Sequence, residues 1–226
     1  MEKRFTTNAL ILANGEFPKN QFVLNKLRSC TGEARSLSEV EMSLAPTIIC
    51  CDGAVQKLLN FGLEPDIIIG DLDSISEDLK RRFAHILVQN PDQETNDLTK
   101  AVQFCLQNGI HTVEILGATG LREDHTLGNI SLLANYAEML TSVKLFTDYG
   151  VFTAISKTTT FESFPNQALS IFSITPQTVI TTQNLEYNVQ NRQFRSWWEG
   201  TLNRSANNFF TIEMDLGKLI IFQAYS

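Results

Sequence analysis

A buried strand that ends in two carboxylates is predicted by the segment Pro65-Asp66-Ile67-Ile68-Ile69-Gly70-Asp71-Leu72-Asp73-Ser74-Ile75. Three consecutive isoleucines are typical of a strand that is covered on both faces. Two acids, one residue apart, follow directly after Gly70. Carboxylate oxygens at the carboxyl end of a buried strand suit a magnesium and phosphate site. An Asp-x-Asp pair alone would also fit a solvated acidic turn, so the prediction depends on the acids that follow it.

Length and composition indicate a globular protein with a sizeable core. The chain has 226 residues, of which 43% are apolar, and this is enough for one large domain or two modest ones. The net charge of −7 argues against nucleic acid as a partner, because binding its backbone requires a basic surface. A nucleotide remains compatible with this charge, because a metal ion can offset it locally.

The four cysteines and the N-terminus favour a reducing compartment. Cys30, Cys50, Cys51 and Cys105 contain no Cys-x-x-Cys pair, so we expect buried reduced thiols rather than disulfides or a zinc site. The N-terminal apolar run is too short for a signal peptide, and no run approaches the ~18 apolar residues of a membrane helix. We therefore expect a cytoplasmic protein without membrane contact.

Strand and helix patterns alternate over residues 1–147. This alternation predicts an α/β domain, with a mainly parallel open sheet that has helices on both faces. One helix is marked by apolar residues at helical spacing from Leu98 to Leu106. The predicted strands are 9–13, 47–51, 67–69, 86–88, 113–116 and 143–146, and the predicted helices are 17–28, 54–61, 77–83, 97–108 and 126–140.

Helical periodicity fades after residue 147. Thr, Val, Ile and Phe become more frequent, and turn residues recur between short apolar runs. This pattern predicts an all-β sandwich domain over residues 148–226. Its predicted strands are 169–174, 179–182, 209–214 and 219–222.

Polar residues follow the predicted strands of the first domain. In an open parallel sheet the carboxyl ends of the strands lie along one edge, and ligands bind there. Loops that are distant in the sequence should therefore converge at this edge. The residues that follow strands are Asn14, Asp52, Asp71, Asp73, Asp97 and the segment 117–125.

The residue types at this edge suit transfer of a phosphorus group. Mg²⁺ prefers carboxylate oxygens and keeps some of its waters, so two or three aspartates suffice. Gly117, Gly120 and a helix start near Asp124 could bring backbone N–H groups to phosphate oxygens. Arg122 offers a planar fork for phosphate, and Lys100 lies one turn after Asp97. The common nucleotide fingerprints, the P-loop and Gly-x-Gly-x-x-Gly, are absent from the sequence.

Each of these residues also has a structural interpretation. Asp52 could be only a helix N-cap, and Asp97 could be only an acid that the helix dipole favours in a first turn. Two other functions also fit an Asp-x-Asp pair. One is a phosphohydrolase with Asp71 as nucleophile and Asp73 as general acid, and the other is a non-catalytic nucleotide sensor. The phosphohydrolase explains neither the Arg122 loop nor the β domain, and simple nucleotide binding by a sensor does not need so many carboxylates.

Four blocks of the sequence resemble the thiamin pyrophosphokinase (thiamine diphosphokinase) family. Their order and spacing cover most of residues 9–147, which makes the match specific. The blocks are Cys51-Asp52-Gly53-Ala54, the segment 65–74, Gln93-Glu94-Thr95-Asn96-Asp97-Leu98-Thr99-Lys100-Ala101, and Gly117-Ala118-Thr119-Gly120-Leu121-Arg122-Glu123-Asp124-His125-Thr126-Leu127-Gly128-Asn129.

The resemblance implies a kinase that transfers the pyrophosphoryl group of ATP to the hydroxyl of thiamin. It implies ATP, Mg²⁺ and thiamin as ligands, and a homodimer with active sites between subunits. It makes Asp71, Asp73 and Asp97 the metal and phosphate carboxylates, and it places Asp124 beside the transferred group. Contacts to ATP are implied for Asn14, Asp52, Lys100, Thr119, Arg122 and His125.

The resemblance extends into the second domain. Asn184-Leu185-Glu186-Tyr187 is similar to the family segment whose aromatic residue stacks on thiamin. Gly200-Thr201-Leu202-Asn203 is similar to the family turn Gly-x-Ser-Asn, so Thr201 and Asn203 are implied as thiamin contacts. The chain departs from the family at Leu202, where Ser is frequent, and in a long connection over residues 29–46. Trp197 and Trp198 are unusual before this turn. They could cover the thiamin pocket or fill the sandwich or the dimer interface, and we prefer the second interpretation.

Overall fold

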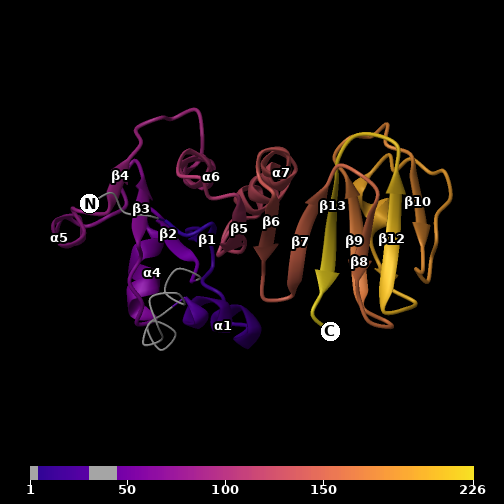
Figure 1. The fold of residues 1–226 in the computed structure, drawn as a ribbon, viewed down its shortest axis with the longest axis horizontal. Helices are drawn as coiled ribbons and strands as arrows, with labels where there is room; N and C mark the ends of the chain where they lie inside the picture. Colours follow the sequence, from indigo (N-terminus) through magenta and orange to yellow (C-terminus); the bar gives the residue numbers. More distant parts are fainter. Residues whose placement is uncertain (1–4, 31–44) are drawn as a thin grey trace. The chain divides into compact units, whose positions relative to one another are not determined.

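The computed structural model describes residues 5–30 and 45–226 and consists of two compact units (Figure 1). The first unit extends to Asn129 and includes Met139–Asp148, and the second comprises Ile130–Glu138 and Tyr149–Ser226. Most of the long connection that was predicted over residues 29–46 lies outside the described residues.

The first unit contains a parallel sheet with the strand order β6-β5-β1-β2-β3-β4. Its adjacent strands pair in parallel throughout, as continuous apolar strands predict. All residues of β2 and β3 are buried, which explains why their sequences do not alternate with polar residues. The strands are β1 (Asn8–Leu12), β2 (Thr47–Cys51), β3 (Ile67–Gly70), β4 (Leu87–Gln89), β5 (Thr112–Leu116) and β6 (Ser142–Phe146).

Among the described residues, five helices connect these strands. They are α1 (Gln21–Ser29), α4 (Ala54–Asn60), α5 (Glu77–Arg82), α6 (Asp97–Gln107) and α7 (Glu123–Met139). Two predicted starts are wrong. Helix α1 begins four residues later than expected, because Asn20 has extended backbone and its side chain caps the helix by accepting from Phe22 N–H. Helix α7 begins three residues earlier, because its first-turn acids suit the helix dipole rather than a loop.

Helix α6 has the apolar face that its spacing predicts. Leu98, Ala101, Val102 and Cys105 are all buried, and the helix packs against β1, β2 and β3. Asn96 caps its start by accepting from Thr99 N–H at 2.9 Å. This packing places Asp97 and Lys100, in the first turn of α6, beside the carboxyl ends of β2 and β3.

The second unit is a β sandwich. One sheet has the order β11-β9-β13-β7 and the other has the order β10-β12-β8. Side chains from both sheets, among them Phe161, Ile171, Phe210 and Ile221, form one buried cluster. The elements are β7 (Gly150–Ile155), β8 (Thr159–Glu162), β9 (Ala168–Ser173), β10 (Ile180–Gln183), the 3₁₀ helix η1 (Trp197–Gly200), β11 (Asn203–Arg204), β12 (Phe209–Met214) and β13 (Leu219–Ala224).

The predicted fold class is confirmed, although the sequence did not indicate β7, β8 and β11. The other strands of the sandwich lie within two residues of their predicted bounds. The four cysteines are free and buried, as expected. In the described part of the chain, no helix has the length and apolar character that a bilayer-crossing segment needs.

Candidate active site

A cavity of about 500 Å³ lies at the carboxyl ends of the strands in the first unit. Several of the predicted site residues line it, namely Asn14, Asp71, Asp97, Lys100, Arg122 and His125. They come from loops after β1, β3, β4 and β5 and from the first turns of α6 and α7, so the structure brings together residues that are more than 100 positions apart. Asp52, Asp73, Thr119 and Asp124 are near neighbours in sequence or space but are not lining residues.

The turn after β3 is shaped by Gly70 and Leu72. A Cβ at Gly70 would lie 2.8 Å from Cβ of Asp52 and 3.4 Å from Cγ of Asp97, so only glycine leaves room for both carboxylates. Leu72 has a φ of 70°, which is unusual for a leucine, and its side chain is buried. Burial of Leu72 therefore anchors a strained turn, and Asp71 and Asp73 stand on either side of it.

Asp52 is a buried carboxylate behind the cavity. Its Oδ2 accepts from Ser74 N–H at 3.3 Å, and its Oδ1 has no hydrogen-bond partner among the described residues. The pKa of Asp52 is raised to about 6, chiefly by burial; the nearby carboxylates of Asp71 and Asp97 also act to raise it, and the hydrogen bond from Ser74 N–H acts to lower it. The pKa of Asp71 is lowered, chiefly by the N–H of Asp73, which donates to Oδ1 at 3.1 Å.

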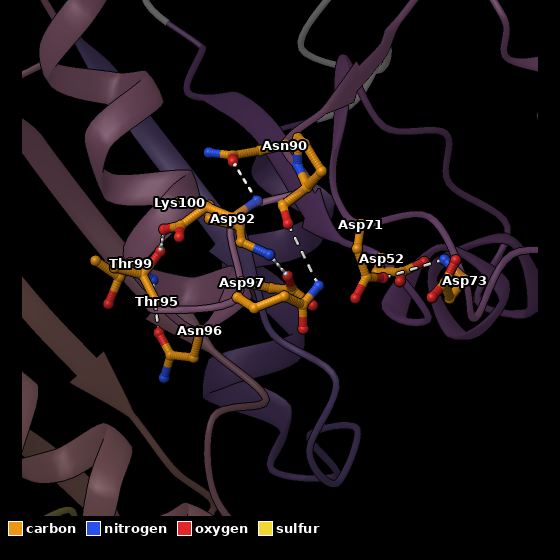
Figure 2. Close-up of polar contacts among 12 residues, drawn as sticks. Asp52, Asp71, Asp73, Asn90, Asp92, Thr95, Asn96, Asp97, Thr99 and Lys100 are labelled. Atoms are coloured by element: carbon orange, nitrogen blue, oxygen red, sulfur yellow. Dashed lines mark hydrogen bonds and ion pairs between the residues drawn. The ribbon is translucent and has the colours of Figure 1, made fainter.

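The loop before α6 is held by its own side chains (Figure 2). Asp92 accepts from the Glu94 N–H at 2.9 Å and from the Thr95 hydroxyl at 2.6 Å, and Asn90 accepts from the Asp92 N–H at 3.1 Å. These contacts fix the loop whose end carries Asp97. Local hydrogen bonds, rather than packed apolar side chains, hold this loop in its conformation.

Lys100 forms an ion pair with Asp97 in the cavity wall. The distance from Nζ to Oδ1 is 3.1 Å, and only 3% of the lysine side chain is exposed. A buried ammonium needs an anionic partner, so Asp97 explains how Lys100 is tolerated there. The structure therefore excludes the interpretation of Lys100 as a solvated surface residue.

Arg122 is paired with Asp124 at the start of α7. Its Nε donates to Oδ1 at 3.0 Å and its Nη2 donates to Oδ2. The pair is largely exposed, and the guanidinium lowers the pKa of Asp124 to about 2. Asp124 thus orients the fork of Arg122 toward the cavity that Arg122 lines.

Backbone contacts join the loops after β1 and β5. Gly15 N–H donates to Gly117 O at 2.6 Å, and a Cβ at Gly15 would lie only 2.5 Å from that same oxygen. Lys57 from α4 also binds the loop after β1. Its Nζ donates to Asn14 O at 3.0 Å, to Asn14 Oδ1 at 2.8 Å and to Gly15 O at 2.7 Å. Asn14 is consequently fixed from two directions.

A second cavity of about 260 Å³ lies in the β sandwich. It is lined by the three residues that were predicted for the acceptor, Tyr187, Thr201 and Asn203. Apolar side chains of Ile171 and Phe194 also line it. Phe194 and Ile171 are buried, whereas 62% of Tyr187 is exposed. A flat apolar ligand could therefore lie against an aromatic ring here.

Comparison with known protein families assigns both units. The model described as "Thiamin pyrophosphokinase, catalytic domain" matches residues 39–145, and the model described as "Thiamin pyrophosphokinase, substrate-binding domain" matches residues 150–222. Together they cover most of the chain. The chain belongs to the thiamin pyrophosphokinase family. This confirms the resemblance that the four sequence blocks indicated, and it makes the chain a member of a family of enzymes.

Individual thiamin pyrophosphokinases are similar in sequence to this chain, in agreement with its family membership. Thiamine pyrophosphokinase 1 of Oryza sativa subsp. japonica is 32% identical over 144 residues, which are 57% of this chain and 54% of the relative. Thiamin pyrophosphokinase 1 of Caenorhabditis elegans is 36% identical over 104 residues, which are 42% of each chain. The matches thus span about half the length of these relatives.

The fold of this thiamin pyrophosphokinase family member is shared with solved structures. The crystal structure of thiamine pyrophosphokinase from Bacillus subtilis superimposes with a TM-score of 0.75 at 22% identity, and it covers 96% of this chain and 98% of its own. The likeness covers both units, so the α/β unit and the sandwich occur together in that chain as well.

The carboxylates fit a hard cation such as Mg²⁺ only with help from other ligands. The carboxylates of Asp71 and Asp97 lie close enough to Asp52 to raise its pKa, and among the described residues Asp52 Oδ1 is a buried acceptor without a hydrogen-bond partner. Over the described residues, however, no three His, Cys, Asp or Glu side chains are arranged to hold a metal by themselves. This fits Mg²⁺, which usually takes one or two carboxylates and completes its shell with phosphate oxygens and waters.

Several lining residues were not singled out individually from the sequence. In the first cavity they include Gln93, Asn96 and Asn129, and in the second they include Arg192 and Glu199. Asn129 links two loops, because it accepts from Asn96 Nδ2 at 3.1 Å and donates to Ala118 O at 2.8 Å. Asn96 and Asn129 stand within the family blocks, so the blocks could have indicated them. Nothing in the local sequence marks Glu199.

Asp52→Asn is expected to stabilise the metal-free protein at pH 8. The folded-state pKa of Asp52, about 6, exceeds the ordinary value of 3.8, so stability that is present below pH 4 is lost as the pH rises through 6. Asn lacks this charge, and the gain at pH 8 should be on the order of 1 kcal/mol after solvent screening. Thermal unfolding in EDTA at pH 4 and pH 8 measures it.

Asp78→Asn provides the charge-matched control for this experiment. Asp78 pairs with Arg81 on the surface of α5, and 87% of its side chain is exposed. Its replacement should give no comparable gain at pH 8. Equal effects of Asp52→Asn at the two pH values would contradict the assignment of a raised pKa to Asp52.

Proposed function

We propose that this chain is a thiamine diphosphokinase, which transfers the pyrophosphoryl group of ATP to the hydroxyl of thiamin and releases AMP. The observation that carries the proposal is the first cavity, where Asp71, Asp97, Lys100 and Arg122 meet at the carboxyl ends of parallel strands. Acids for a cation and cations for phosphate are both needed for phosphoryl chemistry, and family membership indicates which chemistry it is.

The reaction exchanges one phosphorus–oxygen bond for another. The hydroxyl oxygen of thiamin bonds to the β-phosphorus of ATP, and the bond from that phosphorus to the α,β-bridging oxygen breaks. AMP leaves with the bridging oxygen, and the hydroxyl proton passes to a carboxylate. A Mg²⁺ ion held by Asp71, Asp73 and Asp97 would supply charge neutralisation on the phosphates. Lys100 and Arg122 position the phosphates and stabilise charge on the leaving group.

The carboxylates differ in their suitability as proton acceptors. Asp124 is bound by the guanidinium of Arg122, which lowers its pKa to about 2. The pKa of Asp71 is lowered as well, chiefly by the Asp73 N–H, but Asp71 lines the cavity and is not engaged by a guanidinium, whereas Asp124 is outside the lining. We therefore favour Asp71 over Asp124 as the group nearest to the transferred proton, and we assign Asp124 to orienting Arg122.

The second cavity is proposed to receive thiamin, so that the first unit serves ATP and the second serves the acceptor. Thiamin is a flat cation with apolar rings, and the face of Tyr187 could attract it by about 0.5–2 kcal/mol. The carboxylate of Glu199 lines the same cavity, is only 14% exposed and pairs with Arg192 at 3.0 Å. An aromatic face and a carboxylate are groups that recognise an organic cation.

We further propose a homodimer with active sites at the subunit interface and a cytoplasmic location. Two exposed apolar side chains are adjacent in sequence to residues that line the second cavity: Trp198, which is 73% exposed, precedes Glu199, and Leu202, which is 88% exposed, lies between Thr201 and Asn203. Isolated apolar residues of this size are normal on a surface, but a group of them beside a cavity is typical of a contact surface. A second copy of the chain is the partner that the family resemblance implies.

Incubation with ATP, Mg²⁺ and thiamin tests the proposed function. The expected products are thiamin diphosphate and AMP in equal amounts, with AMP formation dependent on thiamin. Free phosphate released without thiamin would instead support a phosphohydrolase that uses Asp71 as nucleophile. Nucleotide binding without any turnover would support a sensor.

Arg122→Lys is expected to lower kcat/KM for ATP by about 10²-fold, because an ammonium cannot reproduce a two-point grip on phosphate. Lysine also cannot keep both contacts with Asp124. Steady-state kinetics with varied ATP measure the effect. Arg81→Lys, in the exposed ion pair of α5, is the matched control and should leave the kinetics unchanged. Wild-type kinetics in Arg122→Lys would show that Arg122 is only a surface charge.

A further inference from the structure

Two segments beside the second cavity form a short antiparallel ladder. Glu186 N–H donates to Arg204 O at 2.8 Å, and Ala206 N–H donates to Asn184 O at 2.8 Å. Leu185 and Ser205 are directly opposed in this ladder. These are ordinary backbone contacts, and they bring the segment 184–187 alongside the segment 203–206.

The ladder continues to Tyr187 through a side chain instead of the backbone. Tyr187 N–H donates to Asn203 Oδ1 at 3.1 Å, and Asn203 Nδ2 donates to Tyr187 O at 2.8 Å. The side-chain amide thus uses one acceptor and one donor against both polar groups of the Tyr187 backbone. A primary amide has the same donor and acceptor as a peptide group, so it can stand in for one.

The backbone around Asn203 explains why its side chain is used. The backbone of Asn203 pairs with Leu169 of β9, so it is committed to the larger sheet. Leu202 has a φ of 61°, in the left-handed region, and this residue turns the chain just before the pairing begins. The backbone of Asn203 therefore pairs with β9, and its side chain is left to form the hydrogen bonds with Tyr187.

We propose that Asn203 is a positioning residue that holds Tyr187 as a fixed wall of the second cavity, rather than a direct ligand of the acceptor. Both Asn203 and Tyr187 line that cavity, and Tyr187 is 62% exposed although its backbone N–H and C=O are both bonded to the Asn203 side chain. Oδ1 of Asn203 also accepts from Arg204 N–H at 2.9 Å, so its polar atoms are engaged within the protein. This proposal rests on the proposed function for the identity of the acceptor.

Only asparagine matches these contacts. Aspartate has nearly the same shape, but it has no donor and would set an oxygen against Tyr187 O. Alanine removes both contacts. A fixed aromatic wall binds a flat ligand with less loss of conformational freedom than a mobile one, so the loss of the clamp should appear in acceptor binding.

The kinetic test compares Asn203→Ala and Asn203→Asp with a matched control. Both variants should raise the KM for thiamin about five- to tenfold, as expected for the loss of one or two hydrogen bonds, and change the KM for ATP less than about twofold. The control is Asn207→Ala, which removes a contact to the Asn184 side chain at 3.1 Å in the same region and should leave both values unchanged. An unchanged thiamin KM in Asn203→Asp would overturn the proposal.

A double-mutant cycle separates positioning from direct contact. If Asn203 acts through the Tyr187 ring, Asn203→Ala should add nothing to the thiamin KM of Tyr187→Ala. If the two effects multiply, Asn203 contacts the acceptor itself and the proposal is overturned. Asn203→Asp should unfold below the wild-type temperature, because it loses one hydrogen bond, but well above the assay temperature, so the comparison does not depend on a misfolded variant.

Amide hydrogen exchange tests the clamp without any substrate. Exchange of the Tyr187 N–H, followed by NMR, should be at least about tenfold faster in Asn203→Ala and in Asn203→Asp than in the wild type, because its acceptor or its geometry is lost. Equal exchange rates would overturn the proposal even if the enzyme uses thiamin. Faster exchange in the two variants, together with a wild-type protein that makes no AMP from thiamin, would contradict the proposed function and leave the clamp supported.

Discussion

Asp71→Asn is expected to lower the kcat of thiamin-dependent AMP formation by about 10³-fold, which corresponds to several kcal/mol of lost charge stabilisation. Asp71 lines the first cavity at the carboxyl end of β3, and an amide there removes a negative charge that a cation requires. The fold should persist. In the wild type, Asp73 N–H donates a hydrogen bond to Asp71 Oδ1 at 3.1 Å, and the Oδ1 of asparagine can still accept this bond.

Asp78→Asn is the control for this variant, because it removes one negative charge from the exposed surface of α5. Its turnover should equal that of the wild type. Asp73→Asn should cause a loss as large as that of Asp71→Asn, although the structure leaves Asp73 exposed and outside the cavity lining. Near-normal turnover of either variant at limiting Mg²⁺ would remove that aspartate from the proposed metal site.

The parallel sheet and the edge where its loops meet could be predicted because continuous apolar runs in the sequence indicate strands that are buried on both faces. The strands Thr47–Cys51 and Ile67–Gly70 carry no polar side chain except that of Thr47, and this pattern requires covered faces on both sides. Once the strands are known to be parallel, their carboxyl ends must lie together. That geometry alone predicted that Asp71, Asp97 and Arg122 would meet, and they line one cavity.

The sequence predicted the sandwich less completely, because short strands depend on their partners. Residues 150–155 form β7 by pairing with β13 over six residue pairs, and this partner lies about 70 positions away in the sequence. The clamp of Asn203 on Tyr187 could not be predicted either. It depends on a left-handed conformation at Leu202, which leucine rarely adopts and which no propensity indicates. The sequence also did not indicate that the ion pair of Lys100 with Asp97 is buried, since a lysine one turn after an acid usually faces solvent.

Mixing Asp71→Asn protein with Tyr187→Ala protein is expected to restore activity from nearly none to about a quarter of the wild-type value. The proposal is that the first cavity of one subunit works with the second cavity of the other. Random exchange makes half of the dimers heterodimers, and each of these has one site in which both residues are intact. The thiamin concentration must lie well below the KM of the Tyr187→Ala variant, so that this variant alone contributes little.

Subunit exchange must be shown independently, for example by mass spectrometry of dimers formed from isotopically labelled and unlabelled chains. If exchange occurs and no activity returns, each site belongs to one chain, because every heterodimer would then contain one Asp71→Asn site and one Tyr187→Ala site. Recovery requires that the carboxylates at β3 and the ring of Tyr187 come from different chains. A mixture of Asp71→Asn protein with Arg122→Lys protein is the matched control. Asp71 and Arg122 line the same cavity of one chain. Each chain of the heterodimer therefore has a defective first cavity, one through Asp71→Asn and the other through Arg122→Lys, and no activity should return.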